Sequence, residues 1–388
     1  MDSSNPSQLS RLHRHQSSLE GVLDFSAEVP LSADQRARAS HQFHHIVRHF
    51  EFPAETRPYS RPLLVRYTYE YARSQESRDV FLRAFFQSMR LSLNDEDVDL
   101  RNTEVETGLR SALFDFADYL LDNFFLPLKA STKKTPQPSP AYHSAIQRAQ
   151  GEQGFVGTPE RISALRGACL VRDRHRCVVS RRFDLKEAIN RTERDGEDAR
   201  DDDGVLLIED ENPMNTLEVA HILPHSLTKA NPGAPLDPSK EAALAILNMF
   251  DMGIAYLIEG ADIDRPRNAL TLTQQLHQLF GEFRIIFEAT DQPHTYRIGT
   301  FLPRHLVRDP PLPITRTLYV AESRAIDLPL PRLLAIHHAI AHILHLSAAG
   351  AYIDSILWDA EEHGIRADGS TELGRLVHLG LGLGLPSG

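Results

Sequence analysis

Cysteine is nearly absent from this chain, and its scarcity excludes two kinds of site. The 388 residues contain two cysteines, Cys169 and Cys177, and no C-x-x-C pair. A zinc knuckle needs closely spaced thiolates, and a disulfide framework needs several cysteine pairs. Both are therefore excluded, and a reducing compartment is expected.

Long apolar runs are missing as well. No stretch approaches the roughly 20 apolar residues that a membrane-spanning helix needs. The N-terminal MDSSNPSQLSRLHRHQSSLE lacks the apolar segment of a secretory signal. Hydrophobic residues still make up 41% of the chain, which is enough for a folded core. A soluble intracellular protein is expected, with no distinction between nucleus and cytoplasm and no membrane partner.

Positive charge is in deficit. The formal net charge is −11, which argues against a surface that attracts nucleic acid everywhere but leaves room for a local basic groove. Residues 191–218 hold eleven acidic residues and three arginines, a net charge of −8. We interpret residues 191–216 as an acidic insert in a solvated loop. The alternative is an electrostatic gate that competes with DNA for nearby arginines.

Signatures of other enzyme classes are also lacking. The chain has no Walker motif, no dinucleotide-binding glycine fingerprint and no G-x-S-x-G nucleophile turn. Nucleotide hydrolysis, hydride transfer and serine hydrolase chemistry therefore have no support.

The pattern of apolar residues predicts an α+β protein with helical flanks. A polar tail covers residues 1–30, and a helical region with an aromatic core covers residues 31–128. A proline-containing linker covers 129–157, a mixed domain 158–300 and a second helical region 301–388. In that last region His338, His342 and His345 share one helix face, which we interpret as a polar stripe rather than a metal site.

Five arginines crowd into the stretch RDRHRCVVSRR, around a short expected strand at residues 177–179. Arginine grips two phosphate oxygens at once, so this density is typical of a nucleic-acid contact. The alternative is ordinary surface arginines that balance the acidic insert. The candidate phosphate contacts are Arg172, Arg174, Arg176, Arg181 and Arg182.

The stretch from residue 217 to 287 carries the clearest chemical pattern. LEVAH alternates as a strand in which Leu217, Val219 and His221 share one face, and Pro224 ends this strand. DRPRN forms a turn that contains Asn268. A short strand follows, and Thr273 can cap a helix that carries His277. FRIIF alternates as another strand, with a hairpin partner at residues 296–298.

The motifs AHILPHS, DRPRNALTL, LHQLFG and FRIIFE resemble the HNH endonuclease domain, and more closely that of fungal proteins carrying such a domain. The resemblance implies a ββα-metal core that binds one divalent cation, Mg²⁺ first and Mn²⁺ or Zn²⁺ otherwise, and a DNA substrate. It implies that His221 is the general base, Asn268 its orienting residue and His277 a metal ligand.

Two positions depart from the pattern of many HNH domains. Ala220 stands where many carry Asp or His before the first histidine, and Gly281 stands where many carry a second helical ligand. Each motif residue alone could also be structural: a buried histidine, a turn asparagine, a helix-face histidine. Two functions are therefore predicted: a metal-dependent endonuclease acting on DNA, or a catalytically degenerate module that binds nucleic acid or a protein partner.

Overall fold

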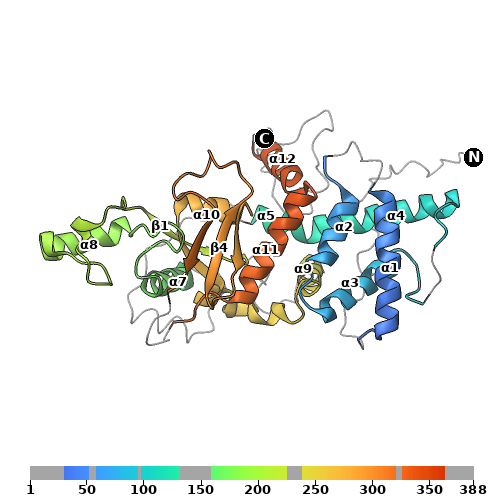
Figure 1. Cartoon of the computed structure of the whole chain (residues 1–388), viewed down its shortest axis with the longest axis horizontal. Coiled ribbons are helices and arrows are strands. Elements are labelled where there is room, and N and C mark those ends of the chain that lie inside the picture. Colours follow the sequence, from blue (N-terminus) through green and yellow to red (C-terminus); the bar gives the residue numbers. More distant parts are fainter. Residues whose placement is uncertain are drawn as a thin grey trace, which may run out of the picture.

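The computed structural model describes residues 30–51, 58–94, 98–131, 159–224, 238–319 and 326–362. The described part combines helices with two small antiparallel sheets, so the expected α+β class is confirmed. The molecule is elongated, with helices α1 to α4 at one end and helix α8 projecting at the other (Figure 1). Residues 1–29 of the predicted tail and most of the predicted linker lie outside the described residues.

The N-terminal helices follow the predicted spacing of apolar residues. Phe43 and Phe81 are fully buried and pack edge to face with their ring centroids 5.6 Å apart. Side chains of Ser32, Ser60, Ser74 and Asn102 cap the first four helices. The elements are α1 (Ala33–Phe50), α2 (Arg61–Glu70), α3 (Gln75–Ser88), α4 (Thr103–Leu120), η1 (Leu121–Phe125) and α5 (Leu126–Ala130).

A two-stranded sheet and one helix carry the predicted site. Strand β1 (Leu217–His221) pairs antiparallel with β2 (Ala269–Thr273), and helix α10 (Gln274–Gly281) follows β2 directly. The Thr273 side chain accepts a hydrogen bond from the Leu276 amide and caps α10, as predicted. Helix α7 (Pro159–Arg172) contacts both strands. The predicted strands and helix are thus confirmed.

A second sheet follows α10. Strand β3 (Ile285–Ala289) pairs with β4 (Thr295–Thr300) as the predicted hairpin, and β4 also pairs with β5 (Ile314–Thr317). Strand β5 lies inside the region expected to be helical, because ITRT is too short to show a clear alternation. Helix α11 (Pro331–Leu346) packs on β3, and α12 (Ala349–Glu362) follows it.

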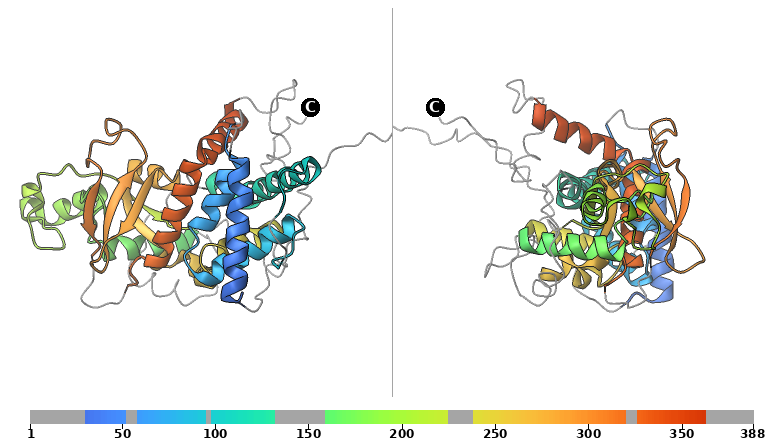
Figure 2. Two further views of the ribbon diagram at one scale, coloured as in Figure 1. Left: turned by 45° about the vertical axis from the view of Figure 1, so that its right-hand side comes forward. Right: turned by 90° about the vertical axis from the view of Figure 1, so that its left-hand side faces the viewer.

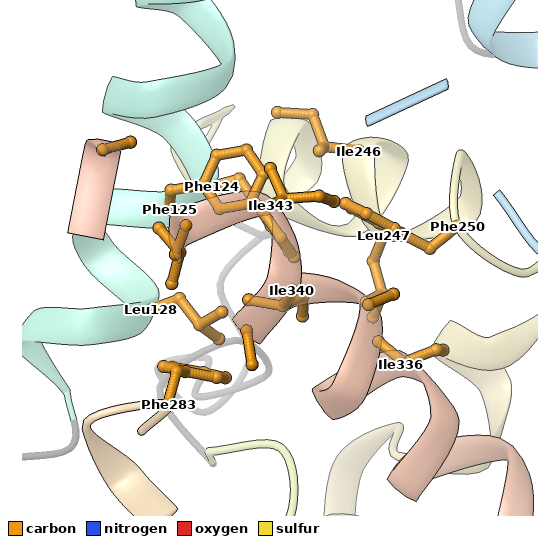
Figure 3. Packing of buried hydrophobic residues seen from close by; sticks show 14 of the residues in the cluster. Phe124, Phe125, Leu128, Ile246, Leu247, Phe250, Phe283, Ile336, Ile340 and Ile343 are labelled. Atoms are coloured by element: carbon orange, nitrogen blue, oxygen red, sulfur yellow. The ribbon is translucent and has the colours of Figure 1, made fainter. Parts of the chain in front are cut away.

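One buried cluster joins the parts of the chain that the sequence separates into regions. Its members run from Leu31 to Leu357. Ile340 of α11 lies near Leu128 of α5, and Ile336 lies below Leu247 of α9 (Pro238–Asn248) (Figure 3). Helix α11 sits between the sheets and the N-terminal helices in Figure 1 and in the left view of Figure 2. The division into domains remains a prediction.

No single helix among the described residues has the length and apolar composition to cross a bilayer. Residues 331–346 and 349–359 satisfy both criteria only when the two helices are counted together, and the pair is bent by 83°.

The acidic insert is folded, which corrects the expectation of a solvated loop. Residues 185–216 contain α8 (Leu185–Asp195), η2 (Gly196–Asp198) and η3 (Leu207–Glu209), and α8 projects from the body (Figure 1). Phe183 and Leu207 belong to a small buried cluster inside this lobe. Arg176 and Arg191 each bind two of its carboxylates, which offsets the repulsion between them.

The short strand expected at residues 177–179 is also absent. These residues lie in a turn that contacts β2 through one backbone hydrogen bond, from the Val178 amide to the Thr271 carbonyl at 2.9 Å. Arg174 and Arg181 have φ values of 55° and 64°, in the left-handed region. A strand cannot continue through such residues.

Helix α11 carries a histidine that is buried without charge. The His337 ring stacks on Phe280 with centroids 3.8 Å apart, and its Nε2 lies 3.0 Å from the Phe280 carbonyl. Burial lowers the pKa of His337 to about 3. Burial also lowers the pKa of its neighbour His338 to about 4. Both imidazoles are therefore neutral in the folded chain at pH 7.

This burial predicts a loss of stability in acid. In the unfolded chain a histidine takes up a proton as the pH falls below its ordinary pKa near 6.5. In the folded chain His337 takes up a proton only near pH 3. The free energy of unfolding should therefore fall as pH drops from 6.5, by up to about 1.4 kcal/mol per pH unit for each such histidine. Urea unfolding between pH 7 and 4.5 measures the slope. His337→Asn should flatten it, and the same change at exposed His305 should not; equal slopes in all three would contradict the assignment.

Candidate active site

His221 ends β1 and pairs with a buried carboxylate. Its Nε2 lies 3.1 Å from Oδ1 of Asp264, whose side chain is 1% exposed, whereas the His221 side chain is 15% exposed. Asp264 ends the turn η6 (Gly260–Asp264), and its other oxygen lies 3.9 Å from Nε of Arg161 on α7. The carboxylate therefore stands between an imidazole and a guanidinium.

Asn268 is fully buried and ties together the segments that carry this pair. Its amide oxygen accepts from the Leu223 N–H at 3.0 Å. Its amide nitrogen donates to the carbonyls of Leu223 and Ile263, both at 2.9 Å. Leu223 lies two residues after His221, and Ile263 directly precedes Asp264. One side chain thus fixes the backbone beside both members of the histidine–aspartate pair.

His277 pairs with a different carboxylate. Its Nδ1 lies 2.7 Å from Oε2 of Glu218, which is on β1 three residues before His221. Side chains alternate along a strand, so Glu218 and His221 lie on opposite faces, and α10 covers the Glu218 face. Glu218 could not have been found as the partner of His277 by considering only residues on the same strand face as His221. The two histidines belong to two separate histidine–carboxylate pairs.

A metal centre would need these pairs to converge. Among the described residues no group of three or more His, Cys, Asp or Glu side chains is placed to hold an ion. Ala220 has no donor atom, and Gly281 ends α10 without one. The side chains that the structure describes therefore do not fit a metal centre with three protein ligands.

Arg172 is part of the interior, which corrects its expected role in phosphate binding. The residue is 1% exposed, and its guanidinium forms two hydrogen bonds to Asp173, at 2.7 and 2.8 Å. It also donates to the carbonyls of Pro266 and Ala269, at 2.7 and 3.0 Å. Arg172 thus holds the turn around Asn268, and no phosphate can reach its guanidinium in this conformation.

The other four arginines lie nearer the surface in different settings. Arg176 binds Asp201 and Asp210, both at 2.8 Å, and its side chain is 11% exposed. Arg174 pairs with Asp203, and Arg182 pairs with Asp309. Arg181 donates to the Thr317 carbonyl of β5 and contacts no carboxylate within the described ranges. Sequence density alone did not separate these roles.

The strand pair, the following helix and the order of side chains define a class of protein. A histidine ends the first strand, a buried asparagine precedes the second, and a histidine lies in the helix, as in nucleases named for that triplet. The model of the HNH endonuclease family matches residues 177–288, which include all three. The chain therefore carries an HNH endonuclease domain. No curated protein and no solved structure gives a significant match, and the likeness to fungal proteins remains a prediction.

Proposed function

We propose that the chain is an endonuclease that hydrolyses phosphodiester bonds in DNA, with His221 as the general base. The observation that carries this proposal is the contact between His221 and the buried carboxylate of Asp264. A carboxylate that accepts one ring N–H holds an imidazole in one tautomer and orientation. General bases in hydrolytic enzymes use this arrangement.

The proposed reaction follows from that tautomer. If the Nε2–H group donates a hydrogen bond to Oδ1 of Asp264, the lone pair of the neutral ring lies on Nδ1. Nδ1 would take a proton from a water molecule as the water oxygen forms a bond to phosphorus. The bond between phosphorus and O3′ breaks, and O3′ leaves with a proton from solvent. Asn268 would keep His221 and Asp264 in register through its contacts with Leu223 and Ile263.

A divalent cation belongs to the proposal because HNH nucleases generally use one, with Mg²⁺ the first candidate. When bound, it would stabilise negative charge on the phosphate. His277 is the ligand that the resemblance assigns, and Glu218 is the carboxylate in contact with it. Because the described side chains do not form a three-ligand set, no step above depends on the ion.

The lack of such a set among the described residues favours a second candidate. In it, the domain keeps the HNH fold and binds nucleic acid or a protein partner without cleaving DNA. Ala220 and Gly281 support this candidate, because each replaces a potential ligand with a residue that has no donor side chain. The two candidates differ in one observable, the appearance of cut DNA.

Conversion of supercoiled plasmid by the full chain tests the proposal. We expect nicked or linear product with MgCl₂ or MnCl₂ and a lower rate in EDTA. Asp264→Asn should lower the rate at least about tenfold, because general acid–base catalysis is worth about 10²- to 10⁴-fold and the amide favours the wrong tautomer. Asp262→Asn, at a partly exposed neighbour in the same turn, is the matched control. No product with MgCl₂, MnCl₂ or ZnCl₂ would favour the non-catalytic module.

A further inference from the structure

Two arginines clamp the turn at residues 177–182 to strand β5. Arg181 donates from Nη2 to the Thr317 carbonyl, and Arg316 donates from Nε to the Val179 carbonyl at 2.7 Å. Each guanidinium thus uses one N–H on the backbone of the other segment. Both side chains are half-buried, and they lie close enough for their charges to interact.

Neither of these two guanidiniums has a carboxylate partner in the described part of the chain, whereas Arg174 and Arg182 each have one and Arg176 has two. Burial and the positive charge of Arg181 lower the pKa of Arg316. The Nη1 group of Arg181 is buried without a hydrogen-bond acceptor. Two like charges are thus kept together without a carboxylate beside them among the described residues, and an anion bound against these half-buried side chains would offset the repulsion between them.

The backbone conformation of Arg181 and its contact with an aromatic ring also favour a binding site for an anion. Arg181 holds a φ of 64°, which is uncommon for a residue with a side chain and often marks a functional site. Its Cζ lies 4.3 Å from the centroid of the Tyr319 ring, and the Cζ of Arg174 lies 5.2 Å from the same centroid. Arginines gathered on an aromatic ring are typical of nucleic-acid surfaces, where the ring can also stack on a base.

We propose that Arg181 and Arg316 form a phosphate-binding site for the nucleic-acid backbone, with Tyr319 as its aromatic floor. Arg316 and Tyr319 lie beyond the residues matched by the HNH family. The turn that carries Arg181 is hydrogen-bonded to β2 through Val178 and Thr271, so the site is attached to the strand pair of the HNH domain. The identity of the ligand as nucleic acid rests on the proposed nuclease function.

Fluorescence anisotropy with a labelled DNA duplex tests the site. The full chain is titrated in EDTA, which slows cleavage, at several salt concentrations. The double variant Arg181→Gln and Arg316→Gln should bind at least about tenfold more weakly, and the slope of log K against log salt should shrink by about 0.9 for each phosphate that the variant no longer neutralises. Arg297→Gln, at an exposed arginine of β4, is the matched control and should change neither quantity.

A second pair of variants separates phosphate binding from a structural role. Arg181→Lys with Arg316→Lys keeps both charges but removes the paired N–H groups, so it should retain most of the salt slope. An equal fall of the slope in the lysine and glutamine variants, or wild-type affinity in the glutamine variant, would mean that the two arginines only tether the turn to β5. A wild-type chain that binds no duplex would also overturn the site.

The same measurements distinguish this inference from the proposed function. A wild-type chain that binds DNA through these arginines but cuts no plasmid keeps the phosphate site and refutes the nuclease. A chain that cuts plasmid while the glutamine variant binds like wild type keeps the nuclease and refutes the phosphate site.

Discussion

His221→Ala should lower plasmid nicking at least about 100-fold, since a positioned general base contributes about 10²- to 10⁴-fold. Alanine removes the ring whose Nε2 contacts Asp264 and leaves no group to take a proton from water. The initial rate at which supercoiled plasmid disappears, measured at saturating metal, gives the effect. DNA affinity in EDTA should remain that of wild type, because the predicted phosphate contacts lie on other residues.

The control for this variant is His305→Ala, at an exposed histidine in the segment between β4 and β5. Its rate should equal that of wild type. Circular dichroism must show the same melting transition for both variants, because Asp264 keeps Arg161 nearby when the imidazole is removed. Equal nicking by wild type and His221→Ala would remove His221 as the base.

Arg172→Met should produce the largest loss of stability of any variant considered. Removing one partner of a buried ion pair costs about 3–5 kcal/mol, because the other charge is left buried and uncompensated. Here that charge is Asp173, which is 1% exposed, and the carbonyls of Pro266 and Ala269 lose a donor as well. The midpoint of urea unfolding should shift strongly at an unchanged m-value.

Two comparisons define this effect. Arg194→Met removes an exposed ion pair with Asp195 and should leave the midpoint almost unchanged. The double variant Arg172→Met with Asp173→Asn should recover part of the stability, because the uncompensated charge is gone. At a temperature where Arg172→Met is folded, its DNA affinity should match wild type. A stable Arg172→Met with weakened DNA binding would restore Arg172 as a phosphate contact.

The elements around the site were predictable because their signals are local. The alternation in LEVAH, the side-chain cap at Thr273 and the turn before Asn268 each depend on a few neighbouring residues. The partners of the two histidines were not predictable in this way. Asp264 lies 43 residues from His221, and Glu218 lies 59 residues from His277, so only the pairing of β1 with β2 brings them together.

The arginine stretch likewise shows that contacts between distant parts of the chain could not be predicted from local sequence. The five arginines carry the same charge but lie in different settings. Arg172 forms a buried ion pair, Arg176 lies half-buried among carboxylates, and Arg174 and Arg182 form ion pairs at the surface. Arg181 contacts no carboxylate among the described residues. Nothing in the letters RDRHRCVVSRR distinguishes these settings. They depend on contacts with residues 201–210 and with β5, which the sequence pattern alone assigned to a loop and to a helical region.

The stacking of His337 on Phe280 connects the HNH domain to the C-terminal helices. Phe280 belongs to the helix of the HNH unit, while His337 belongs to α11, which packs into the core shared with the N-terminal helices. A fragment cut at residues 177 and 288 would expose the Phe280 ring and remove its neighbours on α11. We therefore expect the stretch that the family shares to be less stable as an isolated fragment than within the full chain.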